Sequence, residues 1–306
     1  MRVLVTGAGG FVAQALIRAL PAAFPNAELI LTDRAPGPWR TGDLGDPGFI
    51  DQLTEAPLDL VFHLASLPGT LAEREPERAR RINLDAPLHL ADRLAAQTRA
   101  GGVRPRLVFA SSIAVFGPLG SAPVSEDHPP APTLSYGAQK WMTEIYLADL
   151  TRRGDLDAIS LRLPGIVARP EGAGGFGSAF MSEIFHAARK NRLYTCPTGP
   201  DATAWWMSRS TCAANLLHAA TARDLPPTVT LPALHASLRD VVEALGATQI
   251  TWAPDPKIET LFGRQPPLLA PKALAAGFRT DATPKALVEQ VLHDLRTDAA
   301  APSSLL

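Results

Sequence analysis

Short apolar runs alternate with helical patterns through the first half of the chain. Five runs have the length of buried strands: residues 2–6, 28–32, 59–64, 107–112 and 158–163. An apolar-periodic helix follows the first run to about Ala23, and longer helical stretches cover residues 71–97 and 135–153. Strands that alternate with helices in this way predict a doubly wound parallel sheet, an α/β fold.

The pattern becomes irregular after the fifth predicted strand. A glycine-rich loop covers residues 171–177. Further helices are expected near residues 178–190, 210–221 and 284–296. We therefore expect a sheet domain over residues 1–165 and a smaller region over residues 166–306, part of which returns to the sheet domain.

The helix over residues 135–153 carries candidate chemistry. Ser135 is expected to be its N-cap, and Gly154 ends it. Apolar residues at helical spacing are expected to face the core: Ala138, Trp141, Met142 and Ile145. Tyr136 and Lys140 lie one turn apart on another face.

A tyrosine one turn from a lysine can act as a base. The free phenol has a pKa of about 10, so it is a poor base at neutral pH. A nearby ammonium favours the phenolate and lowers that pKa, and the pair can then take a proton from an alcohol or return one to a carbonyl. The alternative is a surface tyrosine stacked on the stem of Lys140.

Small residues follow the first strand, at Gly7, Gly10 and Ala13. Such a turn lets backbone N–H groups approach a pyrophosphate at a helix N-terminus, where the helix dipole favours anions. A tight strand-to-helix turn without a ligand has the same pattern, so the turn alone is weak evidence.

Acidic residues follow at the spacing that a dinucleotide site requires. Asp33 ends the second strand and is placed for the ribose hydroxyls of adenosine, where its charge would repel a 2′-phosphate. NAD is therefore favoured over NADP, although Arg34 could accommodate the phosphate. Asp43 and Leu44 suit the edge and face of adenine, but Asp43 is equally well explained as a turn residue.

The ends of the third and fourth strands offer further polar groups. Ala65 and Ser66 follow the third strand, and Ser112 ends the fourth, at the edge of a parallel sheet where ligands bind. His63 is flanked by apolar residues and is interpreted as a core histidine. Asn83 is unfavourable in mid-helix, which suggests a polar role such as bonding a strand-end backbone.

Composition narrows the function. The chain has 306 residues, 46% of them hydrophobic, with a net charge of −1 and no basic stripe, which argues against nucleic acid or a membrane as partner. No apolar run could span a bilayer, and no leader precedes the first strand, so a cytoplasmic protein is expected. Cys196 and Cys212 are expected to be free thiols, although one disulfide is possible. Histidine spacing predicts no metal site.

Together, the glycine turn, Asp33, Ser112 and the Tyr136/Lys140 pair resemble the extended short-chain dehydrogenase/reductase family, over essentially the whole chain. Within it, the stretch FASSIAVFG…TLSYGAQK…RRGDLDAISLRLPGIVARP is most similar to the D-erythronate dehydrogenase branch. The resemblance implies NAD as cofactor, a Rossmann domain over residues 1–165, a substrate-binding region beyond it, and oxidation of the C2 hydroxyl of a small sugar acid to the 2-oxo acid.

The resemblance also implies roles for individual residues. Tyr136 is the general base, Lys140 lowers its pKa and holds the nicotinamide ribose, and Ser112 holds the reacting oxygen. The remaining cofactor contacts would be Gly7, Gly10, Phe11, Val12, Asp33, Asp43, Leu44, Leu64, Ala65, Ser66, Asn83, Pro164 and Ile166. Substrate contacts would be Ser112, Ile113, Tyr136, Arg169, Ser178 and Arg209.

The carboxylate of a sugar acid needs a cationic partner. Arg209, after Trp205 and Trp206, is favoured because the tryptophans could exclude water and an arginine grips a carboxylate through two parallel hydrogen bonds. For Arg169 a surface ion pair is the preferred interpretation. Ser178 could reach a distal hydroxyl.

Two alternatives remain open. A nucleotide-sugar epimerase or dehydratase with tightly held NAD is disfavoured because that branch has an aromatic–Phe–Asn run where this chain has residues 163–165, Leu-Pro-Gly. A non-catalytic NAD(P) sensor is disfavoured because it needs no base. The family often forms homodimers through two long helices, here residues 71–97 and 133–153.

Overall fold

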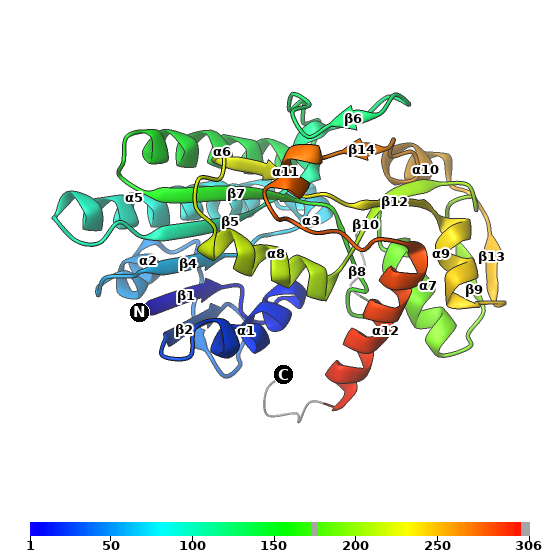
Figure 1. Cartoon of the computed structure of the whole chain (residues 1–306), viewed down its shortest axis with the longest axis horizontal. Helices are drawn as coiled ribbons and strands as arrows, with labels where there is room; N and C mark the ends of the chain where they lie inside the picture. Colours follow the sequence, from blue (N-terminus) through cyan, green and yellow to red (C-terminus); the bar gives the residue numbers. More distant parts are fainter. Residues whose placement is uncertain (173–176, 301–306) are drawn as a thin grey trace.

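A seven-stranded parallel sheet forms the centre of the protein (Figure 1). The computed structural model describes residues 1–172 and 177–300, so part of the predicted glycine-rich loop lies outside the described residues. The strand order is β11 (Thr228–Thr230), β7 (Asp157–Leu163), β5 (Arg106–Ser112), β4 (Leu60–His63), β1 (Arg2–Thr6), β2 (Glu28–Asp33) and β3 (Arg40–Thr41). The predicted doubly wound α/β fold is confirmed, and each of the five predicted strands is present.

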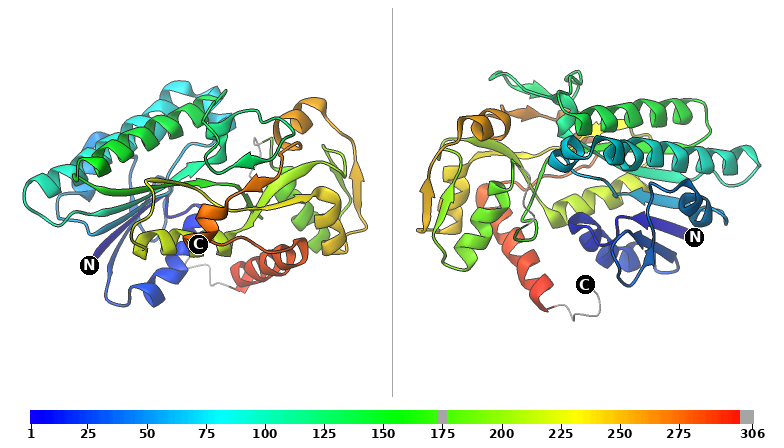
Figure 2. Two further views of the ribbon diagram at one scale, coloured as in Figure 1. Left: turned by 45° about the horizontal axis from the view of Figure 1, so that its top comes forward. Right: turned by 180° about the vertical axis from the view of Figure 1, so that it is seen from behind.

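Helices cover both faces of this sheet, as Figure 2 shows. One face packs against α1 (Phe11–Ala23) and α8 (Arg209–Thr221); the other packs against α2 (Pro47–Leu53), α5 (Ala86–Arg99) and α6 (Ser135–Arg152). Successive residues of β1 therefore point into different cores: Val3 and Val5 into the first, Leu4 into the second. Burial on both faces is why these strands read as continuous apolar runs.

The helical region before α5 is broken rather than continuous. It consists of α3 (Gly69–Arg74), α4 (Pro76–Arg80) and a π-helical turn at Arg81–Asp85 that leads into α5. Pro76 starts α4, where its missing N–H costs no helical bond. The π-turn carries Asn83 to a buried position beneath the end of β4.

The second half of the chain builds a smaller layer beyond the carboxyl ends of the strands. Its sheet has the order β12 (Leu234–Ser237), β10 (Thr203–Ser208) and β8 (Gly165–Val167), packed against α7 (Phe180–Arg189), α9 (Leu238–Leu245) and α12 (Pro284–Ala300). The helix α10 (Pro256–Phe262) and the strand pair β9 (Tyr194–Cys196) with β13 (Ile250–Trp252) also belong to this layer. The strand β6 (Val124–Ser125) pairs with β14 (Leu268–Leu269), and α11 (Pro271–Ala275) packs through Ala273 on the core of the large sheet.

Chain from the second half also lies in the first layer. α8 packs on α1, and β11 adds a strand beside β7. The side chains of Cys212, Leu216 and Val229 share a core with Val3. A division of the chain near residue 165 stays a prediction.

The orientation of α6 was predicted wrongly. Met142 and Ile145, expected in the core, are 44% and 56% exposed, and Trp141 and Ala138 are only partly buried. The buried face is largely polar instead, with Gln139, Lys140, Thr143 and Glu144 on it. These polar groups can be buried because the sheet and neighbouring helices supply hydrogen-bond partners for them.

The start of α6 also differs from the prediction. Its N-cap residue is Leu134, whose side chain forms no capping bond, and Ser135 is the first helical residue. The Ser135 N–H donates to Glu73 Oε1 of α3 at 2.6 Å. The Glu73 carboxylate of α3 therefore caps the start of α6 in place of the Ser135 side chain. Its negative charge lies near the positive end of the helix dipole, which is favourable.

Candidate active site

A cavity of about 760 Å³ lies at the carboxyl ends of β1, β4, β5 and β7. Its wall on the sheet side comes from the loops that follow these strands, and its opposite wall from the second half of the chain. Predicted site residues that line it are Gly7, Gly10, Phe11, Val12, Leu64, Ser66, Ser112, Ile113, Tyr136, Pro164, Ile166, Arg169 and Ser178. The fold thus brings together residues that are up to 171 positions apart in sequence, from Gly7 to Ser178.

Tyr136 lies in the first turn of α6, where that helix meets the cavity. Its hydroxyl has Ser66 and Ser112 as hydrogen-bonding neighbours. Burial raises the pKa of Tyr136 above that of a free phenol, and those two hydrogen bonds and the charge of Arg169 oppose this shift without cancelling it. The phenol therefore has two hydroxyl partners and a cation in position to favour the phenolate.

Lys140 lies directly beneath Tyr136 on the buried face of α6. Its Nζ donates to the carbonyl of Ala110 at 2.7 Å, and it lies 4.5 Å from the ring centroid of Phe109 and 5.6 Å from that of Tyr136. Burial lowers the pKa of Lys140 to about 7, and Glu144 opposes this shift. Burial therefore disfavours the charged form of the Lys140 amine, and Arg169 is the cation whose charge opposes the raised pKa of Tyr136.

The two serines at the end of β5, Ser111 and Ser112, have different hydrogen-bond partners. The Ser111 hydroxyl bonds to Glu144 Oε1 through a short hydrogen bond. Ser112 Oγ accepts the N–H of Ala114 at 3.1 Å, which caps the short helix Ile113–Phe116. The hydroxyl hydrogen of Ser112 therefore points to the Tyr136 oxygen in the cavity, the position that a substrate oxygen would share.

The glycine turn fits a pyrophosphate. Gly7 has a φ of 71°, and a Cβ there would lie 2.8 Å from the backbone of Ala65. A Cβ on Gly10 would lie 2.9 Å from the carbonyl oxygen of Gly7. Gly10 is the N-cap of α1 and provides no side-chain bond, so the first N–H groups of that helix are left for another acceptor at the cavity wall.

Asp33 lies beside this turn, as predicted for an acid that binds ribose. Its Oδ2 accepts the N–H of Gly9 and its Oδ1 accepts the N–H of Ala35, both at 2.9 Å. The carboxylate is only partly buried and keeps further lone pairs for hydroxyl donors. Arg34 beside it is exposed.

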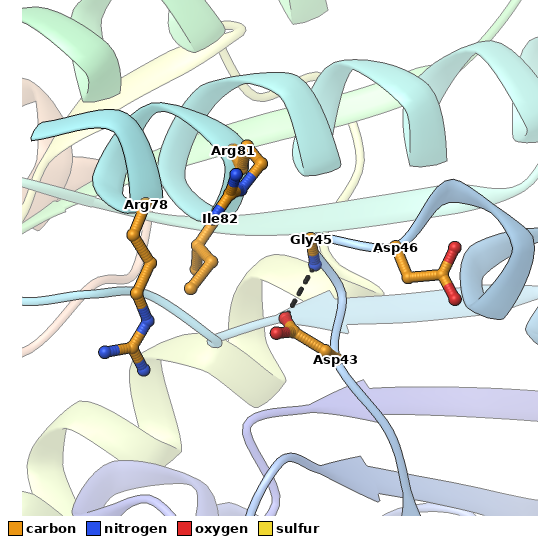
Figure 3. Close-up of a pocket in the computed structure, with 6 residues that line it drawn as sticks. All are labelled: Asp43, Gly45, Asp46, Arg78, Arg81 and Ile82. Atoms are coloured by element: carbon orange, nitrogen blue, oxygen red, sulfur yellow. Dashed lines mark hydrogen bonds between the residues drawn. The ribbon is translucent and has the colours of Figure 1, made fainter.

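A smaller cavity of about 270 Å³ lies between the loop after β3 and the helical segment that contains Arg78 and Ile82 (Figure 3). Asp43 lines this cavity and also accepts the N–H of Gly45 at 2.8 Å. It is therefore a turn residue and a cavity residue at the same time. Arg78 and Ile82 face Asp43 from the helical side. Leu44, expected at the adenine face, packs on the core behind the loop, so Ile82 supplies the apolar wall. Sequence reasoning missed Arg78 and Ile82 because their helix was treated as one continuous element.

Asn83 and His63 support the floor of the site without lining the larger cavity. The Asn83 amide bonds both the N–H and the C=O of Leu67, at 2.7 and 2.9 Å, so its predicted cofactor contact is replaced by a role in holding the loop after β4. His63 is buried, its Nδ1 lies 3.0 Å from Thr6 Oγ1, and burial lowers its pKa to about 3. It is the core histidine that the sequence suggested. Ala65 packs under Gly7 in the same loop.

Arg169 reaches the cavity next to Tyr136. Its Nη2 donates to the carbonyl and the hydroxyl of Ser178, at 3.1 and 3.0 Å. Burial lowers the pKa of Arg169, and the neighbouring Tyr136 opposes this effect. The side chain expected at the surface is therefore a largely buried cation at the reacting end of the cavity.

Arg209 does not line the cavity, which corrects its prediction as the carboxylate clamp. It is 3% exposed, and its guanidinium donates to both carboxylate oxygens of Asp298, at 2.7 and 2.9 Å, and lies over the ring of Phe11. Trp205 and Trp206 are fully buried in two different cores, and of the two only Trp205 lines the cavity. Arg209 therefore joins α8 to α12, and its planar fork is already occupied.

Comparison with known proteins agrees with this geometry. Residues 3–227 match the NAD dependent epimerase/dehydratase family. The chain belongs to this family. It is an NAD-dependent oxidoreductase of the extended short-chain dehydrogenase/reductase type.

Individual relatives cover nearly the whole chain. A D-erythronate dehydrogenase of Cupriavidus necator is 31% identical over 96% of this chain and 98% of its own length. One of Haemophilus influenzae is 27% identical over 96% of this chain and 99% of its own. Among solved structures, a nucleoside-diphosphate-sugar epimerase from Agrobacterium tumefaciens superposes with a TM-score of 0.88 at 28% identity, over 97% and 95% of the two chains.

Metal-ligand clusters and membrane-spanning helices are both absent from the part of the chain that the structure describes. Within residues 1–172 and 177–300, no group of three or more metal-ligating side chains comes together, and none of the helices is long and apolar enough to cross a bilayer. Cys196 and Cys212 are buried, separate thiols.

Proposed function

We propose that this protein oxidises the C2 hydroxyl of a small sugar acid related to D-erythronate, giving the 2-oxo acid, with Tyr136 as general base. The observation that carries the proposal is the position of Arg169 beside the Tyr136 hydroxyl in one cavity. A 2-hydroxy acid presents its carboxylate one carbon from the reacting hydroxyl, so it needs a cation and a base side by side. The names of the two full-length relatives support the same substrate class.

The proposed mechanism assigns a task to each group. Ser112, which bonds to the Tyr136 hydroxyl in this structure, would donate its hydroxyl hydrogen to the substrate oxygen and orient the C2 hydroxyl toward Tyr136. Tyr136 removes the hydroxyl proton, and Arg169 holds the carboxylate and stabilises the phenolate. When bound, NAD supplies the oxidant and takes the C2 hydrogen with its electron pair. Lys140, whose amine donates to the Ala110 carbonyl here, would hold the nicotinamide ribose, as the family resemblance implies.

Ser178 would set the far end of the substrate. Its hydroxyl accepts a hydrogen bond from Arg169 and keeps its own hydrogen for a distal hydroxyl of the acid. The bond also fixes the guanidinium plane, which pre-orients Arg169 for a carboxylate.

The nucleotide-sugar epimerase is the second candidate, favoured by the structural match to such an enzyme. One observation argues against it. At Gly165, where that branch has an asparagine for the sugar nucleotide, a Cβ would lie 2.6 Å from Met181 Cε and 2.8 Å from the Trp205 carbonyl oxygen. No side chain can be added there without moving the backbone of β10.

A screen for net NADH production with four- to six-carbon sugar acids tests the proposal. We expect NADH to accumulate with D-erythronate or a close relative. This result separates the two candidates, since an epimerase would reoxidise its NADH in each turnover. Tyr136→Phe should lower turnover roughly 10²–10⁴-fold and leave NAD binding nearly unchanged. Near-normal turnover of this variant, with chemistry limiting the rate, would show that another group is the base.

Arg169 is tested by comparing substrates with and without the carboxylate. Arg169→Lys keeps the charge but loses the planar fork, so KM for the acid should rise roughly tenfold or more. Arg169→Ala should penalise the acid far more than the matching uncharged polyol. Arg239→Ala, which removes an exposed arginine outside the cavity lining, is the matched control. Equal losses on acid and polyol would remove Arg169 from the clamp.

We further propose that the protein is a homodimer paired through α5 and α6. The outward face of α6 presents Met142 and Ile145, with Trp141 and Ala138 beside them, to solvent. Exposed apolar rows of this kind mark interaction surfaces. Ile145→Asp should therefore yield a monomer in light scattering, whereas Leu193→Asp, on an exposed leucine of the second layer, should not. A monomeric unsubstituted protein would refute the pairing.

A further inference from the structure

The loop between β2 and β3 carries a tryptophan that has no role in the mechanism above. Trp39 is partly buried, although the five residues before it are exposed. Its indole N–H donates to the carbonyl of Ala35 at 2.7 Å, and the Ala35 N–H donates to Asp33 Oδ1 at 2.9 Å. The indole is thus anchored, through one residue, to the acid expected to bind ribose.

Two glycines make room for this ring. A Cβ on Gly37 would lie 2.1 Å from Trp39 Cζ2, and a Cβ on Gly9 would lie 3.0 Å from the same atom. The same added Cβ on Gly9 would lie 3.3 Å from Asp33 Oδ2, which accepts the Gly9 N–H. The benzene ring of the indole therefore lies against the glycine turn and beside the Asp33 carboxylate.

We propose that Trp39 forms the outer wall of the adenosine-ribose site and excludes NADP by steric means. The inference rests on the proposed function only in that the glycine turn and Asp33 hold the adenosine half of the cofactor. A ribose hydroxyl needs room for one oxygen beside Asp33, whereas a 2′-phosphate needs room for a bulky dianion. Trp39 fills the space next to the carboxylate, so it rejects the phosphate by shape, while Asp33 rejects it by charge.

The two effects differ in their dependence on salt. Repulsion between Asp33 and a phosphate near the surface weakens as ionic strength rises, because salt screens it. Exclusion by the indole does not depend on salt. This difference separates the contribution of Trp39 from that of Asp33 without assuming how large either one is.

Calorimetry with ADP-ribose and 2′-phospho-ADP-ribose tests the inference, since neither fragment carries nicotinamide and no turnover is needed. Trp39→Ala should reduce the preference for ADP-ribose by about tenfold or more, by tighter binding of the phosphorylated fragment, at low and high salt alike. Trp39→Phe, which keeps an aromatic wall, should retain most of the preference. Trp252→Phe, in β13 of the second layer, is the matched control and should change nothing.

The result that would overturn the inference is a preference that stays unchanged in Trp39→Ala, or equal weakening of both fragments. The first would mean that Asp33 alone rejects the phosphate, and the second that the indole only supports the loop. Failure of the unsubstituted protein to bind ADP-ribose would overturn it as well. If the protein prefers ADP-ribose over the phosphorylated fragment but turns over no sugar acid, the proposed substrate is wrong. The role of Trp39 in excluding the 2′-phosphate would still stand.

Discussion

Substitution of Glu144 should lower the stability of the folded protein strongly. It lies one turn after Lys140 on the buried face of α6 and is 3% exposed. Arg162 of β7 donates to its two oxygens at 3.1, 3.2 and 2.8 Å, and the Ser111 hydroxyl adds a further bond. One side chain thus joins α6 to β5 and β7 directly behind Tyr136 and Lys140.

Glu144→Gln keeps the size of this side chain but removes its charge. Arg162 is 8% exposed, so its guanidinium would be left buried without a counter-charge. Breaking a buried pair in this way costs about 3–5 kcal/mol, because the desolvation of the remaining ion is no longer offset. For a chain of this size we expect a fall in Tm on the order of 5–10 °C.

Differential scanning calorimetry at pH 7 measures this loss. Glu171→Gln removes a carboxylate that bridges Lys190 and Arg192 at the surface, and it should leave Tm nearly unchanged. Combining Glu144→Gln with Arg162→Met should restore part of the lost stability, since no unpaired charge then remains. If Glu144→Gln lowers Tm no more than Glu171→Gln does, the buried pair does not stabilise the fold as argued.

Two further predictions concern the floor of the site. Burial lowers the pKa of Lys140 from 10.5 to about 7, so between these values the unfolded chain binds more protons than the folded one, and stability rises with pH. Chemical denaturation at several pH values should therefore show the unsubstituted protein gaining stability relative to Lys140→Met as pH rises above 7; a constant difference would contradict the shift. Gly7→Ala should abolish NAD binding in calorimetry, because the added Cβ would lie 2.8 Å from the Ala65 backbone and the φ of Gly7 is 71°. Unimpaired binding by this variant would show that the glycine turn is not part of the NAD site.

The sheet and the sequence of loops at its edge were predictable because they depend on local pattern. Continuous apolar runs mark strands buried on both faces, and glycines mark the turn after the first strand. The carboxyl ends of parallel strands meet at one edge of the sheet, so Gly7, Ser66 and Ser112 could be placed at that edge without coordinates.

The face of α6 could not be predicted from periodicity. Met142 and Ile145 have the spacing of a core stripe, but the same spacing fits a surface that another subunit covers. Which face turns inward depends on partners far away in sequence. Glu144 is buried because Arg162 meets it, and Gln139 because Asn83 does.

The roles of the two arginines were reversed for a similar reason. Arg209 follows two tryptophans, yet its partner Asp298 lies 89 residues away on α12. Arg169 follows a strand and resembles a surface residue, yet the end of β8 places it beside Tyr136 and Ser178, and its N–H donates to Ser182 of α7. Trp39 gave no signal at all, because its contact with Gly9 depends on a loop that folds back.

Transfer of deuterium from C2 of the substrate tests the central claim most directly. D-Erythronate labelled with deuterium at C2 is incubated with the enzyme and unlabelled NAD, and the reduced cofactor and the product acid are analysed by mass spectrometry. We predict that NADH accumulates with the deuterium in it and that the product is the unlabelled 2-oxo acid. Deuterium that stays in an oxidised product would place the reaction at another carbon, and conversion of the acid without net NADH would show an epimerase instead.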